Sequence, residues 1–549
     1  MKVFFSFLLF FSLKSFLFAQ TPVYDWAKNI SGLRNECIYS VASDNSGNVY
    51  GAGYFDSVSS VFNSTTVSNT SSTAYSDAFL VKYDSSGSIL WIKTIGGSLS
   101  ERIKAIDVDS EGNVYVFGSF SSTSVTIGSF VLTSSANSNL FLAKYNANGD
   151  VVWAKKISAS ASATSEVIDV NDSGKLSLSG SFGTSSLMFE SVVLTNTNTN
   201  FTDLFVAQYD LNGNFLWVKQ IGGMAAESAQ TIKIDSDGNT YFGFNFASQS
   251  IQIESTILNN NSNLSNGISY FSDFGIVKLN PNGELIWANR YGGNDNDFIA
   301  SIGLNSSGDL FLTGSFQSSS LNIDGVIMYS NSGQVFNSKL SGSGNVIWAT
   351  NTGNTAKVAS SVVDANGNLY VSGNFFGSAN FNGINVSSAS NAAIFISKFN
   401  SNGLCEWVKS SSAISFISTE AVKRLTMNNQ GDLFYSGYYT NPTFTLDSFT
   451  FSNTNNFLNS FVTKISYNSL ANSSFEKTDV VIYPNPTFDS IRISGFSNDE
   501  ILDFTILDLM GREIINQCKV DDDAIDVTTL NSGVYLLRIG QKTFSFIKK

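Results

Sequence analysis

Acidic side chains are the groups in this sequence whose spacing could support chemistry. An acidic residue stands eleven positions before a turn glycine at five places, which are Glu36, Glu101, Glu227, Asp297 and Glu420. Carboxylate oxygens are preferred ligands of Ca²⁺, and a pair of carboxylates can cleave a glycosidic bond. Carboxylates can also be structural acceptors of backbone N–H groups from the neighbouring unit of a repeated fold. We favour the structural role and keep the Ca²⁺ site and the catalytic pair as alternatives.

The composition excludes several familiar classes of function. The chain has 549 residues and no histidine, so a Ser-His-Asp triad, a Cys-His pair and a His-ligated zinc site are absent. The 31 Lys and Arg against 44 Asp and Glu give a net charge of −13, which offers no basic surface for a nucleic acid. We therefore expect no nucleic-acid partner, and we expect that the chain is not an enzyme.

Seven tryptophans reveal an internal repeat, because they recur about every 60 to 70 residues. They are Trp26, Trp91, Trp153, Trp217, Trp287, Trp348 and Trp407. Six of them follow a turn glycine by four residues, as Trp91 follows Gly87 and Trp217 follows Gly213. One large aromatic side chain per repeat predicts that each indole is buried between adjacent repeats.

Each repeat contains two hairpins. The second ends in the tryptophan strand, and the first turns at a glycine such as Gly112 or Gly367 between apolar strands. Four antiparallel strands in each of seven repeats predict an all-β fold, a seven-bladed β-propeller. Residues 23–30 form a tryptophan strand with no preceding partners, whereas the last repeat lacks one. We therefore predict that residues 23–30 pair with residues 458–466 and close the ring.

The ring topology predicts two different faces. The tight turns inside the hairpins lie on one face, and the longer, variable polar connections lie on the other. Because the first strand of each repeat is innermost, the five acidic residues should surround one mouth of the central channel. Ligand binding is expected on the loop-rich face, near Glu101, Glu227 and Asp297.

The ends of the chain differ from the repeats. Residues 1–19 carry Lys2 and Lys14 with apolar runs, which predicts a signal peptide. The propeller is expected over residues 20–470, a linker over 471–478 and a small β-sandwich over 479–549. No later apolar run is long enough to predict a transmembrane helix in the mature chain.

Two family resemblances follow from these motifs. Segments such as Trp91–Gly97, Trp217–Gly223 and Trp287–Gly293 resemble the secreted bacterial β-propeller repeat family (SBBP-type repeats), which implies the fold and little about function. The C-terminal segment is similar to the type IX secretion system (type A) sorting domain of Bacteroidetes. The residues that carry this second resemblance are Tyr483, Pro484, Asn485, Pro486, Gly511, Leu530, Gly533, Tyr535, Lys548 and Lys549.

The sorting-domain resemblance implies handling by the type IX secretion machinery and a final location in the medium or on the outer-membrane surface. A secreted or cell-surface binding or adhesion protein, with a glycan or a protein as ligand, is the favoured hypothesis. The alternatives are a carboxylate-dependent glycan-active enzyme and a structural component of a surface layer or matrix. We expect no cofactor, and Ca²⁺ at the acidic residues is the one candidate ion.

Overall fold

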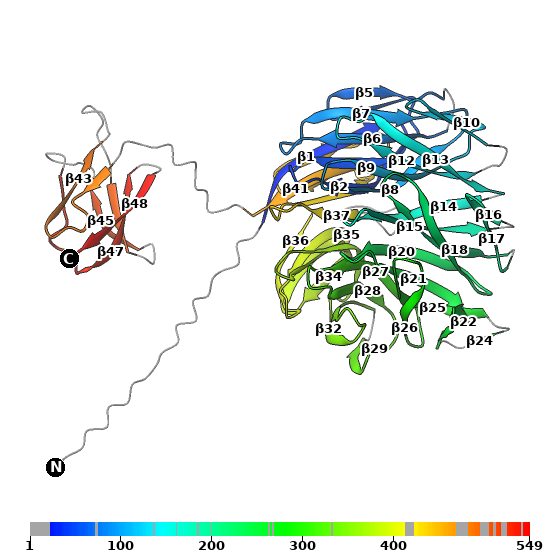
Figure 1. Ribbon diagram of the computed structural model, residues 1–549. Helices are drawn as coiled ribbons and strands as arrows, with labels where there is room; N and C mark the ends of the chain where they lie inside the picture. The colour runs from blue at the N-terminus through cyan, green and yellow to red at the C-terminus, as the bar shows by residue number, and fades with distance from the viewer. Residues whose placement is uncertain are drawn as a thin grey trace, which may run out of the picture. The chain divides into compact units, whose positions relative to one another are not determined.

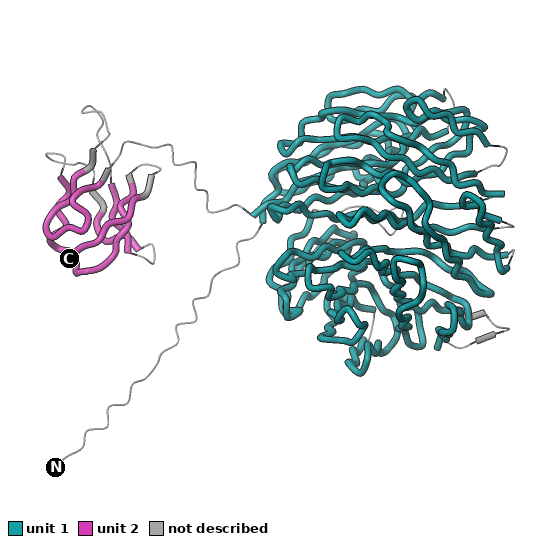
Figure 2. Tube along the Cα trace, viewed as in Figure 1, with its two compact units in different colours: residues 1–467 teal, residues 468–549 magenta. Residues whose placement is uncertain are grey.

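The structure is a computed structural model with two compact units, residues 1–467 and 468–549 (Figure 2). The predicted signal peptide, residues 1–19, and the predicted linker, residues 471–478, lie outside the described residues. The described residues are 22–467 and 481–549, apart from gaps at 72–74, 135–137, 161, 184–185, 199, 262–263, 266–267, 331–332, 412–421, 495–503, 509–511, 518–523 and 540–541.

Antiparallel sheets of four strands make up the first unit, and every described element of the chain is a β-strand. The prediction of an all-β chain is confirmed. We number these sheets as blades and call their strands A to D in the order of pairing. Blade 1 contains β2 (Glu36–Ser43), β3 (Val49–Phe55), β6 (Asp77–Tyr83) and β7 (Ile89–Ile95); blade 2 contains β8 (Glu101–Val108), β9 (Val114–Phe120), β12 (Asn139–Tyr145) and β13 (Val151–Ala159); blade 3 contains β14 (Ser162–Val170), β15 (Lys175–Gly183), β18 (Thr202–Asp210) and β19 (Phe215–Ile221).

The remaining blades have the same order of strands. Blade 4 contains β20 (Glu227–Ile234), β21 (Thr240–Ser248), β25 (Ile268–Leu279) and β26 (Leu285–Tyr291), with the short β24 (Leu264–Ser265) beside β25; blade 5 contains β27 (Asp297–Leu304), β28 (Leu310–Phe316), β31 (Gln334–Leu340) and β32 (Val346–Thr352); blade 6 contains β33 (Ala356–Val363), β34 (Leu369–Phe381), β35 (Ile384–Phe399) and β36 (Cys405–Ser410); blade 7 contains β37 (Val422–Met427), β38 (Leu433–Tyr439), β41 (Asn459–Ser466) and β1 (Val23–Gly32).

The A strands form the inner wall of a closed ring. Each A strand contacts that of the next blade, and β37 of blade 7 contacts β2 of blade 1. Blade 7 takes its D strand from the start of the chain, because β1 pairs with β41 from Val23 opposite Ser466 to Ile30 opposite Ser460. Figure 1 shows β1 in dark blue beside β41 in orange. The predicted closure by residues 23–30 is confirmed, and the sheets of the described residues form a seven-bladed β-propeller.

The tryptophans lie between neighbouring blades. In six blades the indole N–H donates a hydrogen bond of 3.0–3.4 Å to a backbone carbonyl in the C–D turn of the next blade, and Trp407 donates to the hydroxyl of Tyr467. The turn glycine lies under the ring, so a Cβ atom at Gly283 would come within 2.7 Å of Trp217. Glycine is required at this turn for the close approach and for its φ of +80°.

The B–C connections differ from the long polar loops that we expected, because each contains a β-hairpin. In six blades the hairpin strands are separate elements, and in blade 6 the outer ends of β34 and β35 form the equivalent hairpin. The hairpin strands are β4 (Ser59–Phe62) and β5 (Thr65–Ser68); β10 (Ser124–Ile127) and β11 (Phe130–Thr133); β16 (Ser186–Phe189) and β17 (Val192–Thr195); β22 (Ser250–Ile253) and β23 (Thr256–Asn259); β29 (Ser320–Ile323) and β30 (Val326–Tyr329); β39 (Thr443–Leu446) and β40 (Phe449–Ser452).

Alternating side chains of each hairpin are buried in the propeller core. Val125 and Ile127 of β10 are 1% exposed and belong to the same apolar cluster as Ile95 of blade 1 and Phe141 of blade 2. The hairpin of blade 1 also pairs with β1, and that of blade 3 pairs with β13 of blade 2. The hairpins therefore tie adjacent blades together and leave their outer faces exposed.

The second unit has its own core and two sheets. One sheet contains β42 (Val481–Tyr483), β43 (Ser490–Ser494) and β46 (Ala524–Asp526). The other contains β44 (Phe504–Leu507), β45 (Glu513–Gln517), β47 (Gly533–Ile539) and β48 (Lys542–Lys548). Buried side chains from both sheets, among them Ile491, Phe504, Ile525, Leu537 and Phe546, form a single apolar cluster. The unit is a small β-sandwich.

Candidate functional site

The central channel contains two cavities at opposite ends of the A strands. The mouth cavity, of about 560 Å³, is lined by residues from the first halves of these strands. The inner cavity, of about 360 Å³, is lined by residues from the second halves. Since strand B runs antiparallel to strand A, the B–C hairpins lie at the same end as the mouth cavity. This cavity is therefore on the face that carries the longer connections.

A β-bulge in every A strand supplies a side chain to the mouth cavity. The pairing of each A strand with its B strand skips one residue, and that residue always lies eight positions before the glycine of the A–B turn. A bulge leaves its extra residue outside the ladder and changes the direction of the side chain. The seven bulge residues are Tyr39, Lys104, Glu166, Gln230, Ala300, Ala359 and Lys423, and all of them line the mouth cavity.

The chemistry of the bulge residues differs around the ring. Lys423, Tyr39 and Lys104 come from the consecutive blades 7, 1 and 2, and they form the cationic sector of the mouth. The ammonium nitrogen of Lys104 lies 3.9 Å from the centre of the Tyr39 ring, and that of Lys423 lies 5.8 Å from it. On the other side, Ala300 and Ala359 leave space in blades 5 and 6. One ring geometry thus presents an asymmetric set of side chains.

Charged side chains line the mouth cavity. Those among the described residues are Lys104, Lys357, Lys423 and Glu166, together with Arg424, which also lines the inner cavity. Burial lowers the pKa of Lys104, and the charges of Lys423 and Arg102 lower it further, while Glu166 acts in the opposite direction.

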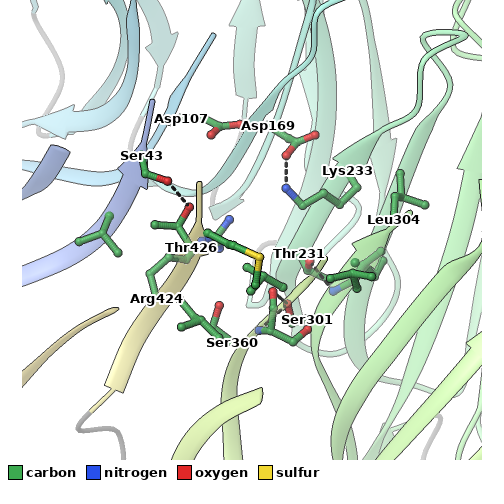
Figure 3. A pocket seen from close by; sticks show the side chains of 18 of the residues that line it. Ser43, Asp107, Asp169, Thr231, Lys233, Ser301, Leu304, Ser360, Arg424 and Thr426 are labelled. Atoms are coloured by element: carbon green, nitrogen blue, oxygen red, sulfur yellow. Dashed lines mark hydrogen bonds and ion pairs between the residues drawn. The ribbon is translucent and has the colours of Figure 1, made fainter. Parts of the chain in front are cut away.

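The inner cavity is lined by polar and charged groups, and Figure 3 shows Lys233 directed toward Asp169. Lys233 forms an ion pair with Asp169, and the Asp169 carboxylate also accepts the backbone N–H of Ile234 in the next blade at 2.8 Å. Asp107 accepts the N–H of Val170 in the same way. Burial and the charge of Asp169 raise the pKa of Asp107 to about 6. These carboxylates therefore join the A strands of neighbouring blades.

The acidic residues that the sequence singled out have a different position from the one we predicted. Glu36, Glu101, Glu227 and Asp297 are buried at the start of their A strands, at most 4% exposed, and none belongs to the lining of the mouth cavity. The prediction that they surround the channel mouth is therefore corrected for these four. Glu420 lies outside the described residues.

A serine 21 positions later in the same blade holds each of these four carboxylates. The hydroxyl of Ser318 donates to Asp297 at 2.7 Å, and the hydroxyl of Ser248 donates to Glu227. The same hydroxyl oxygen accepts the backbone N–H two residues before the acid, as Ser318 does from Asp295 at 2.9 Å. Equivalent contacts join Glu36 to Ser57 and Glu101 to Ser122. Each pair anchors the B–C connection to the A strand within one blade, and not between blades as we expected for structural acceptors.

Burial changes the titration of these carboxyl groups. Loss of solvent raises the pKa of Glu227 from 4.5 to about 8, against the opposing hydrogen bond from Ser248. The same cause raises the pKa of Glu36 and Glu101 to about 7 and that of Asp297 to about 6. Among the described residues, no group of three or more Cys, Asp or Glu side chains has the geometry to hold a metal ion.

The first testable prediction concerns Glu227 and pH. Because its folded pKa is above its unfolded value, the native state keeps a proton that the unfolded chain loses, so stability falls as pH rises from about 4.5 to about 8. We expect Glu227→Gln to remove this loss. Its melting temperature should match wild type near pH 4.5 and exceed it by a few degrees at pH 8. Glu111→Gln, at an exposed turn, is the control; a constant difference across this pH range would contradict the prediction.

The predicted sorting residues lie along the strands of the second unit. Asn485 donates to the carbonyl of Ser545 at 3.2 Å and accepts the N–H of Ile547 at 2.9 Å, which links the Tyr-Pro-Asn-Pro segment to the last strand. Leu530 is 6% exposed in the core, and the Tyr535 hydroxyl donates to the carbonyl of Asn531. Lys548 forms a β-bridge with Thr487, and the N–H of Lys549 donates to the carbonyl of Thr487 at 2.8 Å. Gly511 lies outside the described residues.

Comparison with known proteins gives one match to a family model and several distant likenesses. Residues 481–549 match the family described as the secretion system C-terminal sorting domain. An uncharacterised WD repeat-containing protein of Acanthamoeba polyphaga mimivirus is 24% identical over 64% of this chain and 30% of its own length. The regulatory protein FlaEY of Caulobacter vibrioides is 24% identical over 29% of this chain and 17% of its own. The chain therefore spans less than a third of either curated relative.

Two of the solved structures with a similar backbone fold match most of the length of this chain. The Pan2 WD40 domain of Neurospora crassa has 9% identity and a TM-score of 0.38, and the match covers 79% of this chain and 95% of that one. The structure described as YCF48 bound to D1 peptide has 8% identity and a TM-score of 0.32, with 81% and 97% covered.

The closed ring of four-stranded blades defines the first unit as a β-propeller. The second unit is identified by the family match to residues 481–549. Residues 481–549 are a type IX secretion sorting domain, and the chain is exported by that system to the cell surface or into the medium. A search of the described residues finds no helix long and apolar enough to cross a membrane.

Proposed function

We propose that this exported β-propeller is a binding protein and that its ligand, a glycan or a protein, occupies the mouth cavity. The observation that carries the proposal is the set of seven bulge residues. An identical backbone device in every blade directs one side chain into the same cavity, yet the side chains include two lysines, a glutamate, a glutamine, a tyrosine and two alanines. Packing alone would not require such different side chains at equivalent positions of a repeat.

The size and lining of the cavity support this role. Its volume of about 560 Å³ falls within the usual range of ligand sites, about 300–1,000 Å³. Phe298 and Tyr39 supply aromatic surface, and Gln230, Gln317 and Ser228 supply hydrogen-bonding groups. A rigid ring holds these groups in place, so little ordering is needed on binding. The buried, serine-bound acidic residues give no support to the glycan-active enzyme.

Filling the mouth tests the proposal. Ser228 is exposed and lines the cavity, so Ser228→Trp should occupy the site without disturbing the core. We expect the full-length protein to bind reproducibly to members of an array of glycans and immobilised extracellular proteins. The binding signal of Ser228→Trp for the same members should be at least tenfold lower. Ser307→Trp, at an exposed A–B turn on the opposite face, is the matched control and should bind like wild type. Equal binding by all three proteins would place the site elsewhere.

A further inference from the structure

The boundary between blades 5 and 6 differs from the other blade boundaries. Three residues, 353–355, connect β32 to β33, whereas five residues connect strand D to the next strand A after blades 1, 3 and 4. Strand β33 begins at Ala356, where the A strands of blades 2, 4 and 5 begin with a serine-bound acid. A cavity of about 490 Å³ lies at this shorter connection, and we call it the notch.

Amide side chains dominate the lining of the notch. Of the seven described residues that line it, none is charged or has an apolar side chain, and five carry amides: Gln334, Asn351, Asn354, Asn380 and Asn382. They come from strands C and D of blade 5, from the connection and from the hairpin of blade 6. Gln334 occupies the position at which the C strands of blades 1, 3 and 4 have an aspartate. The neutral lining is therefore specific to this boundary.

Backbone contacts hold the blade 6 side of the notch in place. The N–H of Gly353 donates to the carbonyl of Asn380 at 2.8 Å, and the N–H of Asn380 donates to Oδ1 of Asn354 at 3.0 Å. Among the described residues, neither the NH₂ group of Asn354 nor the side-chain amide of Asn382 has a protein partner. A fixed frame thus presents amide groups that a ligand can bind.

Blade 5 adds two further amides and an aromatic residue. The NH₂ group of Asn351 donates to the carbonyl of Tyr329 at 2.8 Å and to the side-chain oxygen of Gln334. These contacts leave Oδ1 of Asn351 as an acceptor and the NH₂ group of Gln334 as a donor. The side chain of Tyr329 is 71% exposed. Donors, acceptors and an aromatic surface are therefore close together.

This combination fits a neutral sugar better than an ion or a protein segment. An ion needs an opposite charge, and a protein segment usually anchors an apolar or aromatic side chain in a pocket, which the described lining does not offer. Sugar hydroxyls donate and accept as amides do, and the C–H face of a sugar ring packs on an aromatic side chain. We infer that the notch is a second ligand site, separate from the mouth cavity, that binds a neutral oligosaccharide through Gln334, Asn354 and Asn382. Tyr329 supplies the surface for an adjoining sugar ring.

Calorimetric titration of the full-length protein with cellohexaose, maltohexaose, mannohexaose and xylohexaose tests the inference. We expect at least one of them to bind with a dissociation constant of about 0.1–1 mM, independently of salt, because neutral hydrogen bonds replace those to water. Asn354→Asp/Asn382→Gly should weaken this binding about tenfold or more. Aspartate keeps the oxygen that binds Asn380 but loses the NH₂ group, and glycine tolerates the φ of +51° at position 382.

A matched double variant makes the same changes away from the notch. In Asn400→Asp/Asn63→Gly, Asn400 accepts a backbone N–H at a C–D turn, and Asn63 has a φ of +55° in the hairpin turn of blade 1. This control should bind the hexasaccharide like wild type, and both double variants should melt like wild type. Tyr329→Ala changes only an exposed side chain and should weaken binding at least threefold.

The remaining outcomes separate the notch from the mouth cavity. Ser228→Trp, which fills the mouth, should bind the hexasaccharide like wild type; loss of binding there would overturn the inference and support the proposed function. Absence of binding by all four sugars, or equal losses in the two double variants, would overturn the inference and leave the proposed function standing. Tighter binding of the neutral peptide hexaserine than of any of the sugars would overturn the sugar assignment.

Discussion

Deletion of residues 22–32, which include β1, is expected to open the propeller and to cause a large loss of stability. This strand is paired on both sides, with β41 along most of its length and with β4 at its end. Its removal exposes two unpaired strand edges and empties the sites of Trp26 and Ile30, which are 6% and 0% exposed. Truncation of a buried Trp to Ala alone typically costs about 3–5 kcal/mol, so the deletion should cost more.

Thermal unfolding of purified proteins measures this effect. Trp26→Ala should lower the melting temperature by about 5–15 °C, and the deletion should lower it further and cause aggregation. A synthetic peptide of residues 22–34 added to the deletion protein should restore part of the loss by filling the vacant edge. Trp348→Ala is the control, because its indole is only partly buried and lies within the repeat array. Equal losses for Trp26 and Trp348, or no rescue by the peptide, would contradict the closure argument.

The architecture was predictable because its determinants are local and repeated. In six of the seven A–B turns, an Asp or Asn accepts the N–H groups two and four residues later, as Asp44 does from Ser46 and Asn48 at 2.9 Å. The glycine that follows has positive φ, +79° at Gly47. These contacts need only four or five consecutive residues, so the sequence contains them in full. The unpaired tryptophan strand at the N-terminus then specified the closure.

The B–C hairpins were missed because their pattern is short. Val125 and Ile127 alternate with polar residues for only four positions, and the turn residue with positive φ is often not glycine, as at Asn63, Glu190 and Glu254. Such turns resemble ordinary polar loop sequence. Their burial depends on contacts with strand D of the preceding blade, which no local pattern reveals.

The candidate site was misplaced because the acidic residues and the bulge residues lie on different sides of the A strand. Alternation directs residues eleven and nine positions before the turn glycine to one side and those ten and eight before it to the other. Lys104, the bulge residue of blade 2, is at position eight and lines the mouth, and its place outside the ladder follows from pairing with the B strand. The acidic residue at position eleven is buried by a serine 21 residues away, at Ser122 for Glu101. The distance between these partners hid the structural role of the carboxylate.

Removal of the sorting domain is expected to abolish export while the propeller still folds. The apolar cluster of the second unit contains only residues of that unit, and the clusters of the propeller contain none of them. The two cores can therefore form independently. A chain that ends after Tyr467 should melt at the same temperature as the propeller of the full-length protein.

Fractionation of the producing cells measures the effect on export. We expect the full-length protein at the cell surface or in the medium. The chain ending at Tyr467 should stay inside the cell envelope, so that its amount outside the cell falls at least tenfold.

A point variant avoids the large deletion. Leu537→Ala removes a side chain that is 0% exposed in the core of the sorting domain, which should lower the free energy of unfolding of this small unit by about 2–5 kcal/mol. Val534→Ala, on the same strand but 43% exposed, is the matched control and should be exported normally. Because a small β-sandwich is only marginally stable, Leu537→Ala should unfold the sorting domain and strongly reduce export. Normal export of the truncated chain would show instead that the export signal lies in the propeller.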